Sequence, residues 1–314
     1  MKILVTGSCG YKGSVLVPRL LKEGHEIISV DNEWFGNKLP THGKLAHYKE
    51  DVRSLPVELL KGVNTIIHLA NIANDPAVDL NPCLSWEVNV LATQQLAEKS
   101  IRASVSHFIY ASSGSVYGIK KEDKVTEDLE LVPISVYNKT KMVAERVLLS
   151  YTDKMKVHCV RPATVCGMSP RMRLDVAVNM LTYQALSRGE ITVLGGKQTR
   201  PNIHIDDIAN LYIHLVKNSD HIENGCYNAG FENISINTIA KLIASKVDCN
   251  IVVKPSNDPR SYRQDSQKIL ETGYAPEKSV STAIDEIIKE YDNQNLVESD
   301  NCYTVKWMKK NNIS

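Results

Sequence analysis

Residues 1–13, MKILVTGSCGYKG, carry the strongest indication of the fold class. The apolar, β-branched run at 2–6 predicts a buried strand, and a helical pattern follows over 12–23. Three glycines between them also occur in plain turns. A turn in this place, however, lets the backbone approach a pyrophosphate, and the helix start offers free N–H groups to the phosphates. The order of strand, glycine turn and helix therefore predicts a dinucleotide site with these candidate residues: Gly7, Gly10, Tyr11, Lys12 and Gly13.

Strands and helices alternate over the first 170 residues. The predicted strands are 26–30, 64–70, 106–111 and 156–161, with a short one near 47–50. The predicted helices are 54–61, 84–102 and 136–152. Such alternation implies parallel strands with right-handed crossovers, so we expect an α/β fold of the Rossmann type, a doubly wound parallel sheet.

The rhythm changes after about residue 170, where Pro162 and Pro170 interrupt the pattern. Here the predicted elements are helices at 174–188, 206–217, 235–247 and 279–291, and a strand near 226–229. Segment 255–264 is typical of a loop, and the tail 298–314 is expected to be a solvated end. We therefore expect a domain over 1–170, completed by later strands and helices, and a smaller C-terminal α/β lobe over 171–314.

Composition excludes several classes of function. The 314 residues are 43% apolar and 23% charged, which is typical of a globular chain rather than a disordered one. With 37 basic and 36 acidic residues, charge gives no reason to expect nucleic acid or an anionic membrane as a partner. No apolar run approaches the roughly 18 residues of a membrane span, and we expect a cytoplasmic protein. The seven scattered cysteines form no Cys-x-x-Cys pair, so no metal site is expected.

Asp31 ends the second predicted strand, 18 residues after Gly13. A carboxylate there accepts hydrogen bonds from the adenosine ribose and repels a 2′-phosphate. Because Asn32 and Glu33 follow, with no basic residue to pair that phosphate, we expect NAD rather than NADP. Further cofactor candidates end the neighbouring strands: Asp51, Val52, Leu69 and Ala70. Asp31 could instead be a solvated strand end, and Asp51 a turn residue.

Ser113 follows the fifth predicted strand, and Tyr137 and Lys141 lie four residues apart at a helix start, on one helix face. A tyrosine with a pKa of about 10 is a poor base near pH 7. A neighbouring ammonium and a cationic nicotinamide ring both favour the phenolate. Tyr137 could then remove a hydroxyl proton while carbon gives hydride to the cofactor, with Ser113 orienting the hydroxyl.

Together these pieces resemble the extended short-chain dehydrogenase/reductases, in their nucleotide-sugar epimerase/dehydratase branch. The matching strings are TGSCGYKG, IIHLA, EVNVLAT, YASSGSVYG, YNKTK, VRPATVCG and RPNIHIDD, in family order over nearly the whole chain. The resemblance implies Ser113, Tyr137 and Lys141 as catalytic residues, NAD held tightly, and a homodimer formed through helices 84–102 and 136–152. Asn89 falls on a family asparagine that is either structural or part of a proton relay. The further residues expected to bind the cofactor are Asn32, Asn89, Tyr137 and Lys141.

The resemblance also implies that the C-terminal lobe binds a nucleotide-diphosphate sugar. Arg200 and Asn179 fall where family members contact the diphosphate, and arginine suits phosphate geometry. The other substrate candidates are Asn74, Ser113, Thr126, Arg171, Arg173, Arg260 and Arg263. Each loop arginine could equally be a solvated surface residue.

The family contains several reactions that begin with hydride exchange at a sugar carbon. Its dehydratases and decarboxylases carry acidic residues just after the catalytic serine, where this chain has Gly114 and Ser115. We therefore expect oxidation at C4. Longer strings resemble the GDP-heptose 4-dehydrogenases of bacterial capsule synthesis, which would make the substrate GDP-linked. The alternative is a 4-epimerase resembling UDP-glucose 4-epimerase. A hydroxysteroid dehydrogenase would be expected to have an apolar substrate lobe, and the arginines of this lobe argue against that class. A non-catalytic NAD sensor would be expected to lack Tyr137 or Lys141, and both are present.

Overall fold

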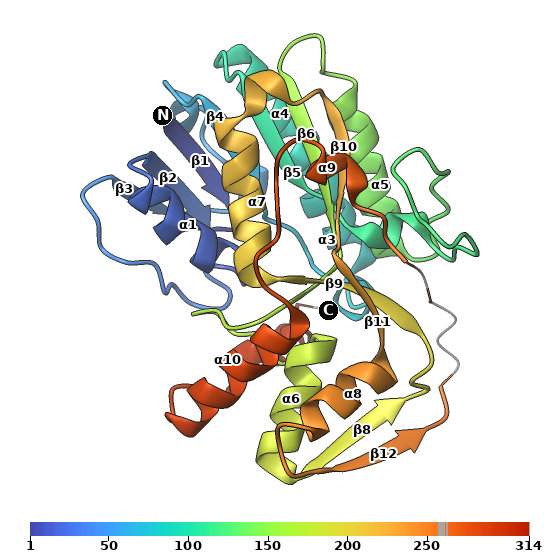
Figure 1. The fold of residues 1–314 in the computed structure, drawn as a ribbon. Helices are drawn as coiled ribbons and strands as arrows, with labels where there is room; N and C mark the ends of the chain where they lie inside the picture. Colours follow the sequence, from blue (N-terminus) through green and yellow to red (C-terminus); the bar gives the residue numbers. More distant parts are fainter. Residues whose placement is uncertain (257–260, 262, 314) are drawn as a thin grey trace.

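The computed structural model describes residues 1–256, 261 and 263–313. Its centre is a seven-stranded parallel sheet in the order β10-β6-β5-β4-β1-β2-β3 (Figure 1). The strands are β1 (Lys2–Thr6), β2 (Glu26–Asp31), β3 (Leu45–Lys49), β4 (Thr65–His68), β5 (His107–Ala111), β6 (Lys156–Pro162) and β10 (Gly225–Ala229). Strands β2 and β3 are added on one side of β1, and the later strands, from β4 onward, are added on its other side. The strand order therefore reverses between β1 and β4, as it does in a doubly wound sheet. The predicted fold class is confirmed.

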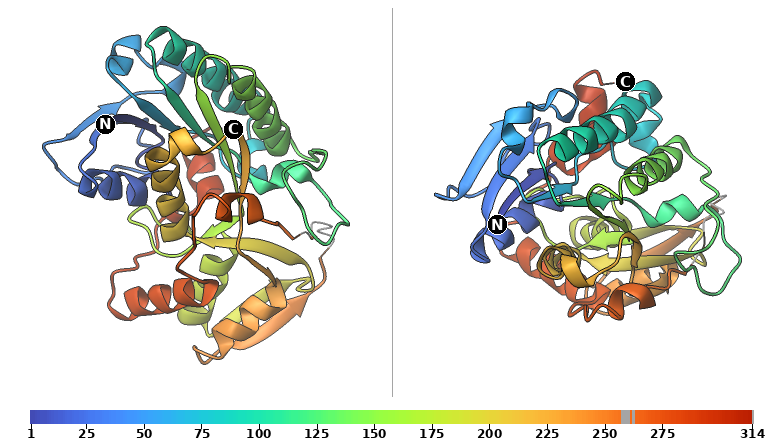
Figure 2. Two further views of the ribbon diagram at one scale, coloured as in Figure 1. Left: turned by 45° about the horizontal axis from the view of Figure 1, so that its top comes forward. Right: turned by 90° about the horizontal axis from the view of Figure 1, so that it is seen from above.

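Helices cover both faces of this sheet (Figure 2). One face carries α1 (Gly13–Lys22) and α7 (Ile205–Lys217), and the other carries α4 (Ala92–Arg102) and α5 (Val136–Leu149). The alternation along β1 explains the two cores, because successive side chains of a strand point to opposite faces. Ile3 and Val5 enter the core with α1 and α7, whereas Leu4 enters the core with α4 and α5.

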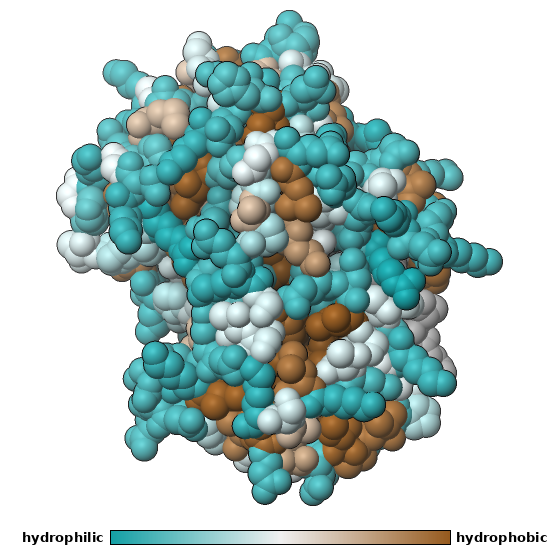
Figure 3. All heavy atoms as spheres, viewed as in Figure 1, coloured by the Kyte–Doolittle hydropathy of each residue, from teal (hydrophilic) through white to brown (hydrophobic). Residues whose placement is uncertain are grey.

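The smaller lobe forms around α6 (Ala177–Arg188), α8 (Ile236–Ala244) and α10 (Val280–Asp292). They pack beside a parallel pair, β8 (Glu190–Leu194) and β12 (Asn250–Lys254). A three-stranded sheet links this lobe to the large sheet: β7 (Thr164–Cys166), β9 (Thr199–His204) and β11 (Glu232–Ser235). Leu194 and Val253 are exposed on the small pair, and an apolar patch lies there at the lower end of the molecule (Figure 3).

Two predicted helices of the first half take other forms. The helix predicted at 54–61 is wrong: two 3-10 turns, η1 (Val52–Ser54) and η2 (Val57–Leu60), stand there. Pro56 lies between the two turns, and a proline disfavours helical backbone in the residue before it; Leu55 accordingly has a ψ of 120° and separates the turns. The helix predicted at 84–102 begins earlier, as α3 (Pro82–Trp86), and passes through one π-helical turn, η3 (Glu87–Leu91), before α4.

The C-terminal tail is not a solvated end, contrary to expectation. It forms α11 (Thr304–Lys310), in which Met308 is buried. The Trp307 ring stacks 5.4 Å from that of Trp34 and lies 5.1 Å from that of Phe35. Met308 shares a core with Ile72, Val78 and Val88, so the tail is buried by segments far earlier in the chain, which local sequence could not indicate.

The remaining elements are short: α2 (Asp75–Val78), η4 (Gly114–Tyr117), η5 (Ser219–His221), α9 (Gln267–Leu270) and η6 (Asp300–Cys302). Among all the helices described, none has the length and apolar character needed to cross a bilayer.

The core beneath α1 gives a stability prediction. Leu20 is fully buried there, so Leu20→Ala should lower the free energy of unfolding by about 2–5 kcal/mol, measured by urea denaturation. Leu194→Ala is the matched control because Leu194 is 55% exposed. Equal losses in the two variants would contradict this assignment of the core.

Candidate active site

A cavity of about 530 Å³ opens where the parallel strands end at their carboxyl edge. In doubly wound sheets, ligands bind at this edge, beside the point where strand order reverses. Its walls come from the glycine turn after β1, the ends of β2, β4 and β5, the start of α5 and the C-terminal lobe. Residues far apart in the chain therefore meet in a single site.

The glycine turn is shaped by close backbone contacts. Gly7 has φ +67°, and a Cβ there would lie 2.6 Å from the backbone nitrogen of Ala70. A Cβ on Gly13 would lie 2.4 Å from the carbonyl oxygen of Gly7. Gly10 lines the cavity itself, so a side chain there would take up cavity space. Because α1 begins at Gly13, the turn presents the helix start to the cavity, and the arrangement fits a pyrophosphate.

Asp31 stands at the end of β2 on the cavity wall. Its carboxylate accepts hydrogen bonds from the backbone N–H groups of Cys9 (3.0 Å) and Glu33 (2.7 Å). Burial raises the pKa of Asp31, although these two hydrogen bonds oppose the shift. A carboxylate fixed in this position is suited to accept hydrogen bonds from the free hydroxyls of a ribose. Asp51 instead forms an ion pair with Arg53, in which Oδ2 lies 2.8 Å from Nη2.

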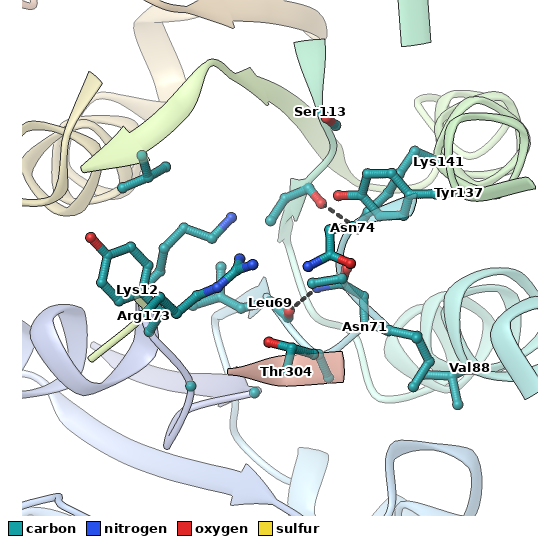
Figure 4. A pocket seen from close by; sticks show the side chains of 18 of the residues that line it. Lys12, Leu69, Asn71, Asn74, Val88, Ser113, Tyr137, Lys141, Arg173 and Thr304 are labelled. Carbon is teal, nitrogen blue, oxygen red and sulfur yellow. Dashed lines mark hydrogen bonds between the residues drawn. The ribbon is translucent and has the colours of Figure 1, made fainter. Parts of the chain in front are cut away.

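Tyr137 and Lys141 enter the cavity from α5, and Ser113 enters from the end of β5 (Figure 4). The Lys141 side chain is buried, and its Nζ donates to the carbonyl of Ala111 at 2.8 Å. The same Nζ lies 6.0 Å from the centre of the Tyr137 ring. Burial, with help from Lys12, holds the pKa of Lys141 well below its usual value. The Lys141 amine therefore lies beside the phenol of Tyr137, where burial disfavours its positive charge and a neighbouring phenolate would favour it.

Behind these residues lies a buried ion pair. Arg161, on β6, donates Nε and Nη2 to the two carboxylate oxygens of Glu145 at 3.0 and 2.8 Å. Glu145 lies on α5 one turn after Lys141 and also accepts a hydrogen bond from Ser112, the neighbour of Ser113. Arg161 donates to the Tyr117 hydroxyl at 2.7 Å as well. The pair therefore fixes the end of β5 against the helix that carries Tyr137 and Lys141.

Position 114 faces away from the cavity. A Cβ on Gly114 would meet the side chain of Gln264 at 3.1 Å and the carbonyl of Pro162 at 3.3 Å. Ser115 does line the cavity, and its hydroxyl lies 2.7 Å from that of Ser113. Residues 113–115 thus present hydroxyl groups and no carboxylate to the cavity.

Most of the predicted site residues line the cavity together. On the cofactor side these are Gly7, Gly10, Tyr11, Lys12, Gly13, Asp31, Asn32, Asp51, Val52, Leu69 and Ala70. The predicted substrate residues that line it are Asn74, Ser113, Arg171, Arg173 and Arg200.

The other predicted residues lie elsewhere, among the residues described. Asn89 is buried and bonds to both backbone groups of Ile72, so its position matches the structural role rather than a cofactor contact. Asn179 is fully buried and bonds to Gly167, Tyr11 and Arg173, so its amide braces the cavity wall instead of facing it. Thr126 and Arg263 are outside the lining, and Arg263 pairs with Asp123. Arg260 lies outside the described residues.

Sequence reasoning missed part of the lining. Trp34, Phe35, Asp175, Thr304 and Met308 all face the cavity. Trp34 and Phe35 follow Asp31 closely, and two aromatic residues beside a ribose-binding carboxylate were an available signal. Thr304 and Met308 carried none, because their position depends on how the tail packs.

Comparison with known proteins agrees with this geometry. The NAD dependent epimerase/dehydratase family matches residues 3–230, and the chain belongs to that family. A UDP-glucose 4-epimerase of Lactobacillus helveticus is 27% identical, over 85% of this chain and 89% of that protein. An uncharacterized UDP-glucose epimerase, YtcB, of Bacillus subtilis (strain 168) is 33% identical, over 77% of this chain and 81% of its own length.

Solved structures add a match in fold. UDP-glucuronic acid 4-epimerase from Bacillus cereus, in complex with UDP-glucuronic acid and NAD, superposes with a TM-score of 0.81. It is 28% identical and covers 93% of this chain and 100% of that one. The expectation of an NAD-dependent enzyme of this family is confirmed.

The buried pair behind the site gives a prediction. Glu145→Ala would leave Arg161 charged, buried and unpaired, so the free energy of unfolding should fall by about 3–5 kcal/mol. Denaturant unfolding measures the loss, with Glu98→Ala as the control, because Glu98 pairs with the exposed Arg102 at 3.8 Å and should cost about 1 kcal/mol or less. A loss as small as that of the control would mean that the pair does not brace the site.

Proposed function

We propose that this protein is an NAD-dependent nucleotide-sugar 4-epimerase that acts on a UDP-linked sugar. The observation that carries the proposal is the meeting of Ser113, Tyr137 and Lys141 on one wall of the cavity, opposite the glycine turn. The UDP-sugar names of the relatives support it. They favour the epimerase alternative over oxidation of GDP-heptose to a released ketone, the reading first expected from resemblance.

The chemistry assigned to each residue follows from its position. Tyr137 removes the proton of the C4 hydroxyl, and Ser113 holds that hydroxyl in place. Lys141 stabilises the phenolate by its charge. NAD held at the glycine turn would supply the hydride acceptor and, in its reduced form, the hydride donor. Tyr137 would give the proton back when the resulting ketone is reduced on its opposite face, so the product is an alcohol of inverted configuration and neither atoms nor electrons are gained or lost.

The residues after Ser113 argue against loss of water. Elimination needs a second acid and base near the sugar, and Gly114 and Ser115 supply neither at neutral pH. Arg200, on β9, lines the cavity from the C-terminal lobe and is our candidate for binding the substrate diphosphate, with Asn74 as a candidate for binding the sugar.

The homodimer also stays a prediction. It is consistent with Leu91, which is exposed between α3 and α4.

Tyr137→Phe tests whether the chain is a catalyst or a binding protein. Removing the phenol should lower kcat by about 100- to 10,000-fold while the cofactor stays bound. Turnover and bound nucleotide are both measured, and Tyr48→Phe on the far edge strand is the control. Unchanged turnover in Tyr137→Phe would overturn the enzymatic assignment.

The reaction itself is tested by incubating the enzyme with UDP-glucose, GDP-mannose and GDP-heptose, and analysing products by mass spectrometry and NMR. We expect an isomer of unchanged mass from a UDP-sugar. A product lighter by about two hydrogens would instead identify a dehydrogenase that releases the ketone. Loss of a water molecule would contradict the argument from Gly114 and Ser115.

A further inference from the structure

Three cationic side chains line the cavity on the side of the glycine turn and the C-terminal lobe: Lys12, Arg171 and Arg173. Lys12 belongs to the glycine turn, whereas both arginines come from the segment that opens the C-terminal lobe. Lys12 and Arg173 enter side by side from the wall opposite Tyr137, with their charged ends together (Figure 4). The charge of Arg173 lowers the pKa values of both Lys12 and Arg171, although burial is the larger cause in each case.

The cluster is short of negative charge. Arg173 pairs with Asp175 at 2.7 Å, and Asp175 also accepts the backbone N–H of Thr304 at 2.9 Å. The side chain of Lys12 forms no hydrogen bond or ion pair with any described residue, and Arg171 has no ion pair among them. Two positive charges therefore remain uncompensated.

Arg171 is the clearest sign of a missing partner. It is 5% exposed, its guanidinium lies 3.8 Å from the centre of the Phe35 ring, and Nη2 donates to Thr304 at 3.3 Å. Its Nε finds no hydrogen-bond acceptor among the described residues. Burial lowers the pKa of Arg171 to about 9 and that of Lys12 to about 8. Buried charges without partners destabilise a protein unless a ligand compensates them.

A pyrophosphate diester carries two negative charges, which matches the two uncompensated cations. We propose that Lys12, Arg171 and Arg173 bind the diphosphate of the cofactor, and that α11 closes over it. The cofactor is favoured over the substrate because Lys12 stands in the glycine turn and Phe35 follows Asp31 by four residues. The inference rests on the cofactor of the proposed function, and it moves Arg171 and Arg173 from the substrate side to the cofactor side.

The C-terminal helix forms the outer wall of this site. Thr304 and Met308 line the cavity, and Trp307 holds the helix against Trp34 and Phe35. Thr304 also contacts both Arg171 and Asp175, so the helix is tied to the cationic cluster itself. Exchange of the cofactor therefore requires α11 to move away from Trp34.

The test measures release of radiolabelled NAD from the loaded enzyme during a chase with unlabelled NAD. Arg171→Met should speed release by about 10- to 100-fold, the effect of losing a charge-assisted hydrogen bond. Trp307→Ala should also speed release, because it frees α11 without changing the charge of the cluster. Arg102→Met is the control, since Arg102 lies on the exposed face of α4, and its release rate should equal that of the parent.

Two further measurements separate the cluster from other roles. UDP binding to the NAD-loaded enzyme should be unchanged in Arg171→Met, and weakened UDP binding with unchanged NAD release would assign the cluster to the substrate instead. Nucleotide-free Lys12→Met should unfold at no lower temperature than the parent, because it loses an uncompensated charge. A lower melting temperature with unchanged NAD release would make the cluster structural and overturn the inference. An enzyme that never binds NAD would instead defeat the proposed function.

Discussion

The site depends on the close approach of the glycine turn to the end of β4. Gly7 lies so near Ala70 that no side chain fits between them, and Gly13 lies equally close to the turn that precedes it. This contact puts the start of α1 at the carboxyl edge of the sheet, where the ends of β2 and β5 also arrive. Asp31, Ser113 and the helix start therefore share one cavity because the strands are parallel and their ends meet.

The second half of the site is held by buried polar contacts in addition to the apolar packing of α5 against the sheet. Glu145 joins α5 to β6 through Arg161 and to the end of β5 through Ser112. A pair of this kind is a costly way to stabilise a fold, because both charges lose their hydration. Its geometric effect is to fix the helix that carries Tyr137 and Lys141 against the strand end that carries Ser113. We infer that the benefit lies in the alignment of these three side chains.

The fold was accessible from sequence because its signals are local. The strand, glycine turn and helix of residues 1–23, and the alternation that follows, each depend on residues adjacent in the chain. The predictions that were wrong have physical causes, some of which are visible in the sequence. Pro56 disfavours helical backbone in the preceding residue, Leu55, and so interrupts the helix predicted over 54–61. The amides of Asn89 and Asn179 were assigned to ligands by resemblance, whereas their hydrogen bonds go to backbone and side chains of the protein.

The amino-acid sequence alone was enough to predict the class of fold, the glycine turn and the placement of Tyr137 and Lys141 on one helix face, since each of these depends on residues close together in the chain. Ser113 lies on another element, and the fold brings it into the same cavity. The three-dimensional structure was needed to show that Lys12 and Arg173 lie side by side and that Arg171, Thr304 and Met308 line the same cavity. These contacts join segments separated by well over a hundred residues. Their formation depends on which surfaces remain to be buried once the sheet has assembled, and no local pattern encodes that.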